Sequence, residues 1–141
     1  MKMQKEILDF LCTTKVATIC YVNNGLPYCF NCLYAVIPGT EGIIFKSSKA
    51  SLHSQQMQDD TPIAGTMYQA APNGIDNTGV QFNGKVTTNN KISEIAKKAY
   101  YKRFPLALVI PGQIFIIIFD TTKFSHTKNG IRRKIDWQKT F

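Results

Sequence analysis

Acidic and histidine side chains are scarce in this sequence. The 141 residues include 9 Asp and Glu and 2 His, so a catalytic carboxylate pair or a Ser-His-Asp set has few residues to draw on. The motifs G-x-S-x-G, H-E-x-x-H, G-x-G-x-x-G and the P-loop are missing as well. If the protein does chemistry, we expect a bound cofactor to supply it; we predict no metal site and assign no catalytic residue from the sequence.

Long apolar runs are also missing. No run approaches the roughly 20 residues of a membrane span, so no membrane association is predicted. The first residues, MKMQKEILDFL, place Glu6 and Asp9 among apolar side chains. This pattern predicts an amphipathic helix rather than a signal peptide, and hence a cytoplasmic protein.

Cysteine occurs four times, at positions 12, 20, 29 and 32. The sequence CFNC matches C-x-x-C, but it lies in the predicted strand PYCFNCLYAV, where residues three apart point to opposite faces. No second C-x-x-C and no His pair completes a zinc site. Buried, reduced thiols are the prediction that fits this pattern.

Basic residues outnumber acidic ones by 17 to 9, which gives a formal net charge of +8. Such a charge attracts nucleic acid, a membrane surface or small anions. The basic residues are spread along the chain and no nucleic-acid-binding motif accompanies them, so nucleic acid is not the expected partner. A phosphorylated small molecule would benefit from the same field.

The pattern of strands and turns predicts one domain, residues 1–141, of the mainly β class with peripheral helices (α+β). Strands are predicted at 15–22, 28–36, 43–47, 61–69, 80–88 and 112–120, with a possible seventh at 130–137 after a loop at 122–129. Helices are predicted at 2–12, 50–59 and 90–104. Short turns between these six or seven strands favour a small closed, mostly antiparallel β-barrel.

The stretch FKSSKASLHSQQ, residues 45–56, gathers hydroxyl and basic groups where a strand meets a helix. Ser47, Ser48 and Ser51 could donate to a phosphate, with Lys46 and Lys49 adding charge and the helix start favouring an anion. The alternative is that Ser48 or Ser51 only caps the helix. The residue types alone leave both interpretations open.

The segments GLPYCFNCLYAV, GIIFKSSKASLHSQQM, PIAGTM, GVQFNGKV and AKKAYYKRFPLA, in this order, resemble the FMN-binding split-barrel superfamily, which is pyridoxamine 5′-phosphate oxidase-like. Within it, the chain is most similar to a small uncharacterised bacterial subgroup. The resemblance implies a six-stranded antiparallel split β-barrel that forms a homodimer and binds FMN at the subunit interface.

The resemblance also implies a set of cofactor-binding residues. Ser47 and Ser51 match the positions that hold the FMN phosphate, and His53 falls where Lys or Arg is common. Asn31 would lie beside the flavin ring, and Gln81 would bond its edge. Trp137 would cover the ring from the partner subunit.

Two departures argue against pyridoxal phosphate synthesis. True pyridoxamine phosphate oxidases carry an Arg- and His-containing segment after their late tryptophan, whereas this sequence ends with DWQKTF. Phe30 also stands where those enzymes have a basic residue. We therefore expect an FMN-binding oxidoreductase-like protein that transfers hydride through flavin N5 to or from an unidentified small substrate. The alternative is a non-catalytic module that binds or senses flavin or haem.

Overall fold

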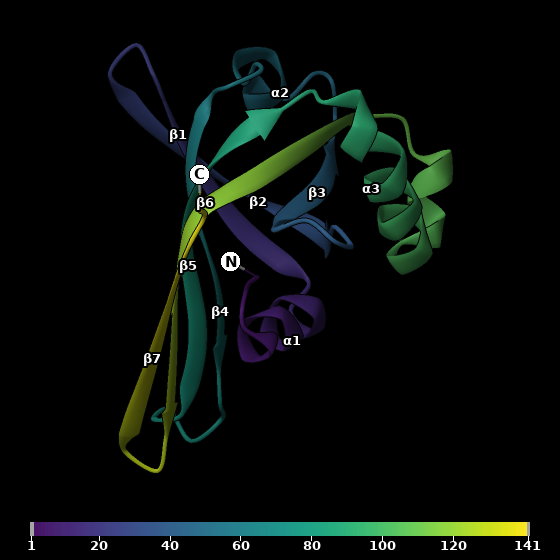
Figure 1. Cartoon of the computed structure of the whole chain (residues 1–141). Coiled ribbons are helices and arrows are strands. Elements are labelled where there is room, and N and C mark those ends of the chain that lie inside the picture. The colour runs from purple at the N-terminus through teal and green to yellow at the C-terminus, as the bar shows by residue number, and fades with distance from the viewer. Residues whose placement is uncertain (1, 141) are drawn as a thin grey trace.

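The computed structural model describes residues 2–140 and is built around seven antiparallel strands (Figure 1). The strands are β1 Val16–Asn23, β2 Leu26–Val36, β3 Gly42–Ser47, β4 Pro62–Ala70, β5 Asn77–Thr87, β6 Gln113–Lys128 and β7 Ile131–Gln138. The helices are α1 Lys5–Thr13, α2 Leu52–Gln56, α3 Asn90–Arg103 and the 3₁₀ helix η1 Pro105–Val109. Among residues 2–140, no helix combines the length and apolar composition needed to cross a bilayer.

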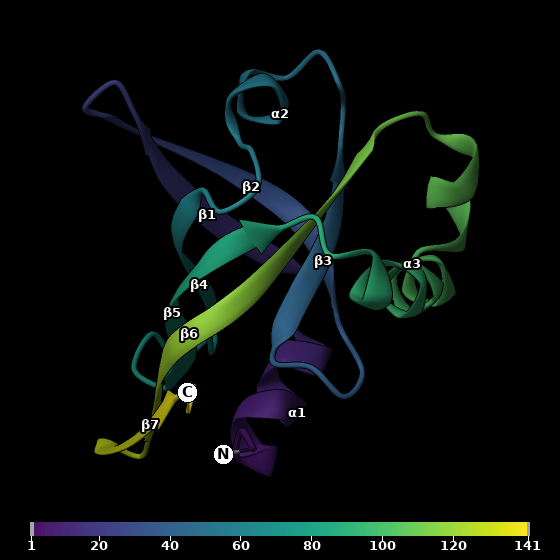
Figure 2. The same ribbon diagram turned by 45° about the horizontal axis from the view of Figure 1, so that its top comes forward.

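Six of the strands close into a ring. The order is β3-β2-β1-β4-β5-β6, and β6 pairs again with β3, while β7 adds to the far half of β6. This confirms the predicted six-stranded antiparallel barrel. Figures 1 and 2 show α3 and η1 together on one side of the barrel near β3, with α1 and α2 at opposite ends.

Alternating side chains explain why these segments form a barrel. On β5, Val80, Phe82, Gly84 and Val86 are buried while the residues between them face outward. Such a period of two places one face of each strand inside the ring. Burying each large apolar side chain contributes roughly 1.5–3 kcal/mol, so this shared interior stabilises the closed sheet.

The largest correction to the predicted elements concerns β6. Residues 122–129 were expected to form a loop, but β6 continues to Lys128 and pairs with β7. Phe124 is buried and its neighbours are partly or fully exposed, so the segment alternates like a strand despite its polar composition. Lys123 is exposed, while Thr122 is buried on the same face as Phe124.

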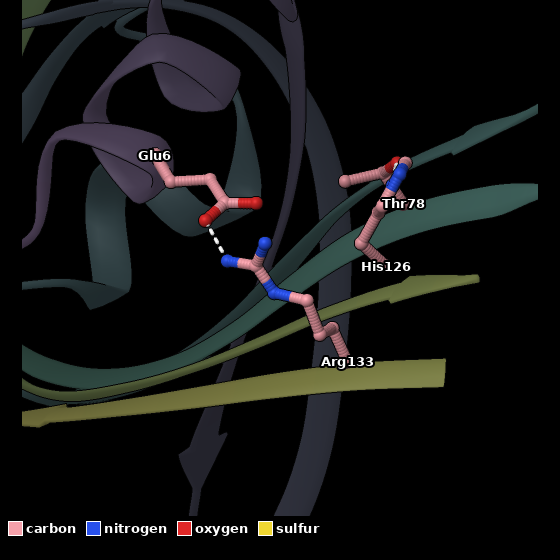
Figure 3. A network of polar contacts seen from close by, with 4 residues as sticks. All are labelled: Glu6, Thr78, His126 and Arg133. Atoms are coloured by element: carbon pink, nitrogen blue, oxygen red, sulfur yellow. Dashed lines mark hydrogen bonds and ion pairs between the residues drawn. The ribbon is translucent and has the colours of Figure 1, made fainter. Parts of the chain in front are cut away.

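Polar contacts fasten α1 to this extended part of the sheet (Figure 3). Arg133 on β7 donates to the Glu6 carboxylate on α1, and the two side chains form an ion pair. Nearby, Thr78 Oγ1 lies 2.7 Å from His126 Nδ1 across the β5–β6 pair. Arg133 and His126 therefore have structural partners.

The cysteines are all free, as predicted, but they are not all buried. Only Cys32 is buried, at 8% exposure, because its side chain points into the barrel. Cys12 and Cys29 are exposed and Cys20 is intermediate. The prediction of burial was wrong for Cys29 because odd-numbered residues in this part of β2 face outward.

Candidate functional site

A cavity of about 550 Å³ lies between the outer face of β2, the end of β3 and the α3–η1 segment. Its lining includes Asn31 and Leu33 from β2, and Lys46, Ser47 and Ser48 from the end of β3. Apolar side chains of η1 and its flanks form much of the remaining wall. The volume falls within the range typical of small-molecule sites.

The polar end of this cavity continues into a neighbouring hollow. Lys46, Ser48 and Lys49 line that hollow, together with Gly112 and apolar residues after η1. In the described part of the chain, no Asp or Glu lines either space. Hydroxyl and ammonium groups without a competing carboxylate favour an anionic ligand at this end.

Lys46 is held in place by the helical segment. Its Nζ donates to the Ala107 carbonyl oxygen at 2.9 Å and contacts the Tyr101 hydroxyl at 3.2 Å. The ammonium also lies 5.2 Å from the centre of the Tyr101 ring. An ammonium carries three donors, so these contacts leave capacity for a ligand. Lys46 thus links β3 to the wall formed by η1.

His53 contacts Ser47 and Ser51, the two serines predicted to hold the phosphate. Its Nε2 is 2.8 Å from Ser47 Oγ and 3.2 Å from Ser51 Oγ. The ring is buried at 9% exposure and stacks on Phe30, with centroids 3.6 Å apart and planes 3° from parallel. Burial lowers the pKa of His53, which favours the neutral imidazole. In this geometry His53 positions the serine hydroxyls.

Ser51 is also tied into the turn that precedes α2. Its Oγ lies 2.7 Å from the Ser48 carbonyl oxygen and 2.7 Å from Ser54 Oγ. It occupies the N-cap position of α2 without a side-chain capping bond. The hydroxyl therefore stabilises the turn through Ser48 and Ser54 rather than capping the helix in the usual way.

Asn31 faces outward from β2 and is exposed. Its Oδ1 accepts a hydrogen bond of 2.7 Å from Thr18 Oγ1 on β1, which leaves the amide NH₂ available. The same cross-strand row continues through Thr66 on β4 to Gln81 on β5. With strands about 4.8 Å apart, Gln81 lies roughly 14 Å from Asn31 and outside the cavity.

Gln81 instead lines a second hollow, of about 440 Å³, on the outer face of β4–β7. Charged groups in this hollow come from Lys123, Arg132, Lys134 and Asp136.

Trp137 is buried at 3% exposure on the inner face of β7 and pairs with Thr122 on β6. Thr122 lies nine residues, roughly 30 Å, along β6 from Gln113, the strand partner of Ser47. Neither Gln81 nor Trp137 lines the cavity in the same chain.

Sequence reasoning missed the α3–η1 contribution to the site. Arg103 lines the cavity and donates to the Tyr34 and Thr14 carbonyl oxygens at 3.0 and 2.7 Å. Tyr100 lines it too, and burial raises the pKa of its hydroxyl. The signal available in the sequence was KRFPLALVIP, a basic pair followed by an unusually apolar segment.

The closed ring, the added β7 and the outer helices define a split β-barrel of the pyridoxamine 5′-phosphate oxidase-like type. No protein-family model matches the chain. The UPF0306 protein YhbP of Salmonella arizonae is 29% identical over 132 residues, which cover 93% of this chain and 90% of YhbP. YhbP of Salmonella paratyphi B is also 29% identical, over 129 residues.

Solved structures of low sequence identity share the fold. A FAD binding protein from Mycobacterium smegmatis superposes with a TM-score of 0.68 and 9% identity, covering 90% of this chain and 97% of that one. A heme binding protein from Mycobacterium smegmatis superposes with a TM-score of 0.69 and 13% sequence identity, covering 98% of this chain and 59% of that one. A Clostridium acetobutylicum protein described as pyridoxinephosphate oxidase family superposes with a TM-score of 0.61 and 11% sequence identity, covering 94% of this chain and 92% of that one. The chain therefore has the fold of these flavin- and haem-binding proteins.

Proposed function

We propose that the protein binds FMN in the cavity between β2, β3 and η1 and acts as an FMN-dependent oxidoreductase in the cytoplasm. The observation that carries the proposal is the composition of the cavity. An apolar wall suits a flat ring system, and one end carries Ser47, Ser48 and Lys46 beside Lys49. The shape and the charge both match a ring with a phosphorylated tail.

In this proposal the residues of β3 and the following turn hold the phosphate. Ser48 and Lys49 are exposed at the mouth, and Ser48 Oγ, which accepts a hydrogen bond from the Ala50 N–H, keeps its own O–H to donate to an anion. Ser47 and Ser51 are less exposed than these two residues, and their contacts with His53 orient their hydroxyls. Asn31 offers its amide NH₂ to the ring edge. FMN, when bound, supplies hydride transfer at N5 to or from a small substrate.

The proposed dimer would explain an apolar surface beside the cavity. Leu106, Leu108, Val109 and Ile110 are 58–83% exposed, and Leu33 is 48% exposed on the neighbouring strand. Clustered apolar side chains on a surface mark interaction sites. A second copy packed here would close the cavity mouth. The proposed role of Gln81, which is exposed, then belongs to a contact made from that second copy, whereas Trp137 is buried in its own chain and would have to leave that position to cover the ring.

A non-catalytic flavin-binding module is the second candidate function. Among the described residues that line the cavity, none is His, Asp or Glu, so a side chain suited to proton transfer near pH 7 is missing there. Cys32 is buried and its pKa is raised to about 12, which removes its thiolate as a haem ligand or nucleophile. The cavity therefore favours a flavin over haem.

Titration of the purified protein with FMN and with riboflavin tests the binding proposal. Charge-assisted hydrogen bonds contribute about 1.5–3 kcal/mol, so FMN should bind at least tenfold more tightly than riboflavin. Lys49→Met should reduce this preference. Lys128→Met makes the same change in charge at an exposed position on β6, distant from the cavity along that strand, and should leave the preference intact.

Two results would overturn the proposal. One is no FMN binding at tens of micromolar. The other is equal affinity for FMN and riboflavin. Once FMN is bound, oxidation of NADH or NADPH with added electron acceptors separates the two functions, because a binding module would bind flavin without turnover.

A further inference from the structure

Two cysteines face each other across the β1–β2 hairpin, two residues along β2 from the cavity residue Asn31. Cys20 on β1 and Cys29 on β2 are direct cross-strand partners. Asn24 and Gly25 form the turn between the strands, with φ of 51° and 77°. Both positive angles are typical of a two-residue type I′ turn, which fixes the register of the hairpin.

The register also fixes the kind of pair that the cysteines form. In a two-residue hairpin the flanking residues, Asn23 and Leu26, make a hydrogen-bonded pair, and the two kinds of pair then alternate. Val22 and Pro27 follow as a non-hydrogen-bonded pair, in agreement with the missing N–H of proline. Two positions further on, Cys20 and Cys29 are again non-hydrogen-bonded.

Non-hydrogen-bonded pairs bring side chains closest together. Their Cα atoms are about 4.5 Å apart, within the 4.4–6.8 Å span that a disulfide bridges. The two side chains leave the same face of the hairpin, because directly opposite residues of an antiparallel pair point to the same side. A bond between them therefore needs rotation of side chains rather than movement of the backbone.

The surroundings of the two thiols differ. Cys29 is exposed, so a disulfide in solution can reach it. Cys20 is half-buried, and burial together with the neighbouring Cys29 raises the pKa of Cys20 to about 11. Cys32 faces the barrel interior, and Cys12 lies on α1, so neither occupies a cross-strand position opposite Cys29.

We infer that Cys20 and Cys29 form a redox-active dithiol, which a small-molecule disulfide such as oxidised glutathione converts into an intramolecular cross-strand disulfide. The Cys29 thiolate attacks one sulfur of the small disulfide and expels one small thiolate. The Cys20 sulfur, after losing its proton to solvent, then attacks the Cys29 sulfur and expels the second. Two protein thiols are oxidised by two electrons, and one disulfide is reduced to two thiols.

The inference does not rest on the proposed flavin function, although Cys29 lies two residues from Asn31 along β2. It depends only on the hairpin register and on the exposure of Cys29, and it needs no bound cofactor. The high pKa of Cys20 makes the second step faster at alkaline pH, because a larger fraction of this thiol is then ionised.

Incubation of the native protein with oxidised glutathione, followed by chymotrypsin digestion and mass spectrometry, tests the inference. Cleavage after Tyr21, Tyr28 and Phe30 places Cys20, Cys29 and Cys32 on different peptides. We expect a Cys20–Cys29 linked pair, with a loss of two hydrogens from the intact protein, and complete reversal by dithiothreitol.

Single substitutions provide matched controls. In Cys20→Ser the first step remains and the second is blocked, so one glutathione should stay attached at Cys29. In Cys29→Ser neither product should form at this hairpin. Cys12→Ser should behave like the unchanged protein.

Several outcomes would overturn the inference. These are persistence of both thiols in the folded protein, stable glutathione on Cys29 while Cys20 is present, or linkage of Cys29 to Cys32 or to a second chain. Repeating the experiment with Cys20→Ala excludes an effect of the serine hydroxyl, and circular dichroism confirms that each variant is folded.

Discussion

His53 gives the chain a stability that depends on pH. The pKa of the buried ring is lowered from its ordinary 6.5, whereas the unfolded chain keeps a value near 6.5. As the pH falls below about 6.5, the unfolded state takes up a proton that the folded state resists. The stabilisation is therefore complete above pH 6.5 and is lost as the pH falls toward the pKa of the folded protein.

The size of this effect has an upper limit. A single group changes the free energy of unfolding by no more than about 1.4 kcal/mol per pH unit, so between pH 7.5 and 5.5 His53 removes up to about 1.3 kcal/mol. In His53→Gln the pH-dependent part disappears, while an amide remains near Ser47. The variant also loses the stacking on Phe30, a constant offset of about 0.5–1.5 kcal/mol.

Urea denaturation of both proteins at several pH values separates the slope from the offset. The difference in the free energy of unfolding between wild type and His53→Gln should shrink as the pH falls from 7.5 to 5.5, because only the wild type loses the contribution of His53. All other titrating groups are common to both proteins. Phe30→Leu is the matched control, since it removes the stacking but keeps the imidazole, and its slope should follow the wild type. A difference between wild type and His53→Gln that stays constant over this range would refute the reasoning.

Three further substitutions test the barrel, the cavity wall and the proposed interface. Gly84→Ala should destabilise the protein by about 1–3 kcal/mol or more, because an added Cβ would lie 2.2 Å from the backbone oxygen of Ile118; thermal unfolding measures this. Lys46→Met should cost about 1–2 kcal/mol of stability through loss of the Ala107 contact, and should weaken FMN binding in the same preparation. Leu108→Asp should convert the proposed dimer into monomers without unfolding it, because this side chain is 64% exposed; light scattering that shows the same mass for both proteins contradicts the assigned interface.

The barrel was predictable because its signals are local. The Asn24-Gly25 pair is typical of the turn that joins β1 to β2, and the residues of β5 alternate between buried and outward-facing positions. The second half of β6 was missed because its polar composition resembles a loop. Only its pairing with β7 shows that this polar segment continues the strand.

The candidate site was predictable only in part. Lys46, Ser47 and Ser48 are adjacent in sequence, so any fold that exposes them keeps them together. Asn31 lies beside these three residues only because β2 pairs with β3 in an antiparallel register. The apolar wall of the cavity depends on where η1 packs. The sequence motif could not show that His53 faces Ser47 and Phe30 rather than solvent.

Composition, alternation and turn chemistry by themselves determined a single basic antiparallel barrel with hydroxyl and amine groups at the end of one strand. These properties depend on residues a few positions apart, where the backbone geometry is fixed. Tertiary structure alone decided that β3 pairs with β6, that Lys46 reaches Ala107, and that Gln81 and Trp137 lie away from the cavity. Such contacts join residues far apart in the chain, and their positions follow from closure of the whole sheet rather than from any local pattern.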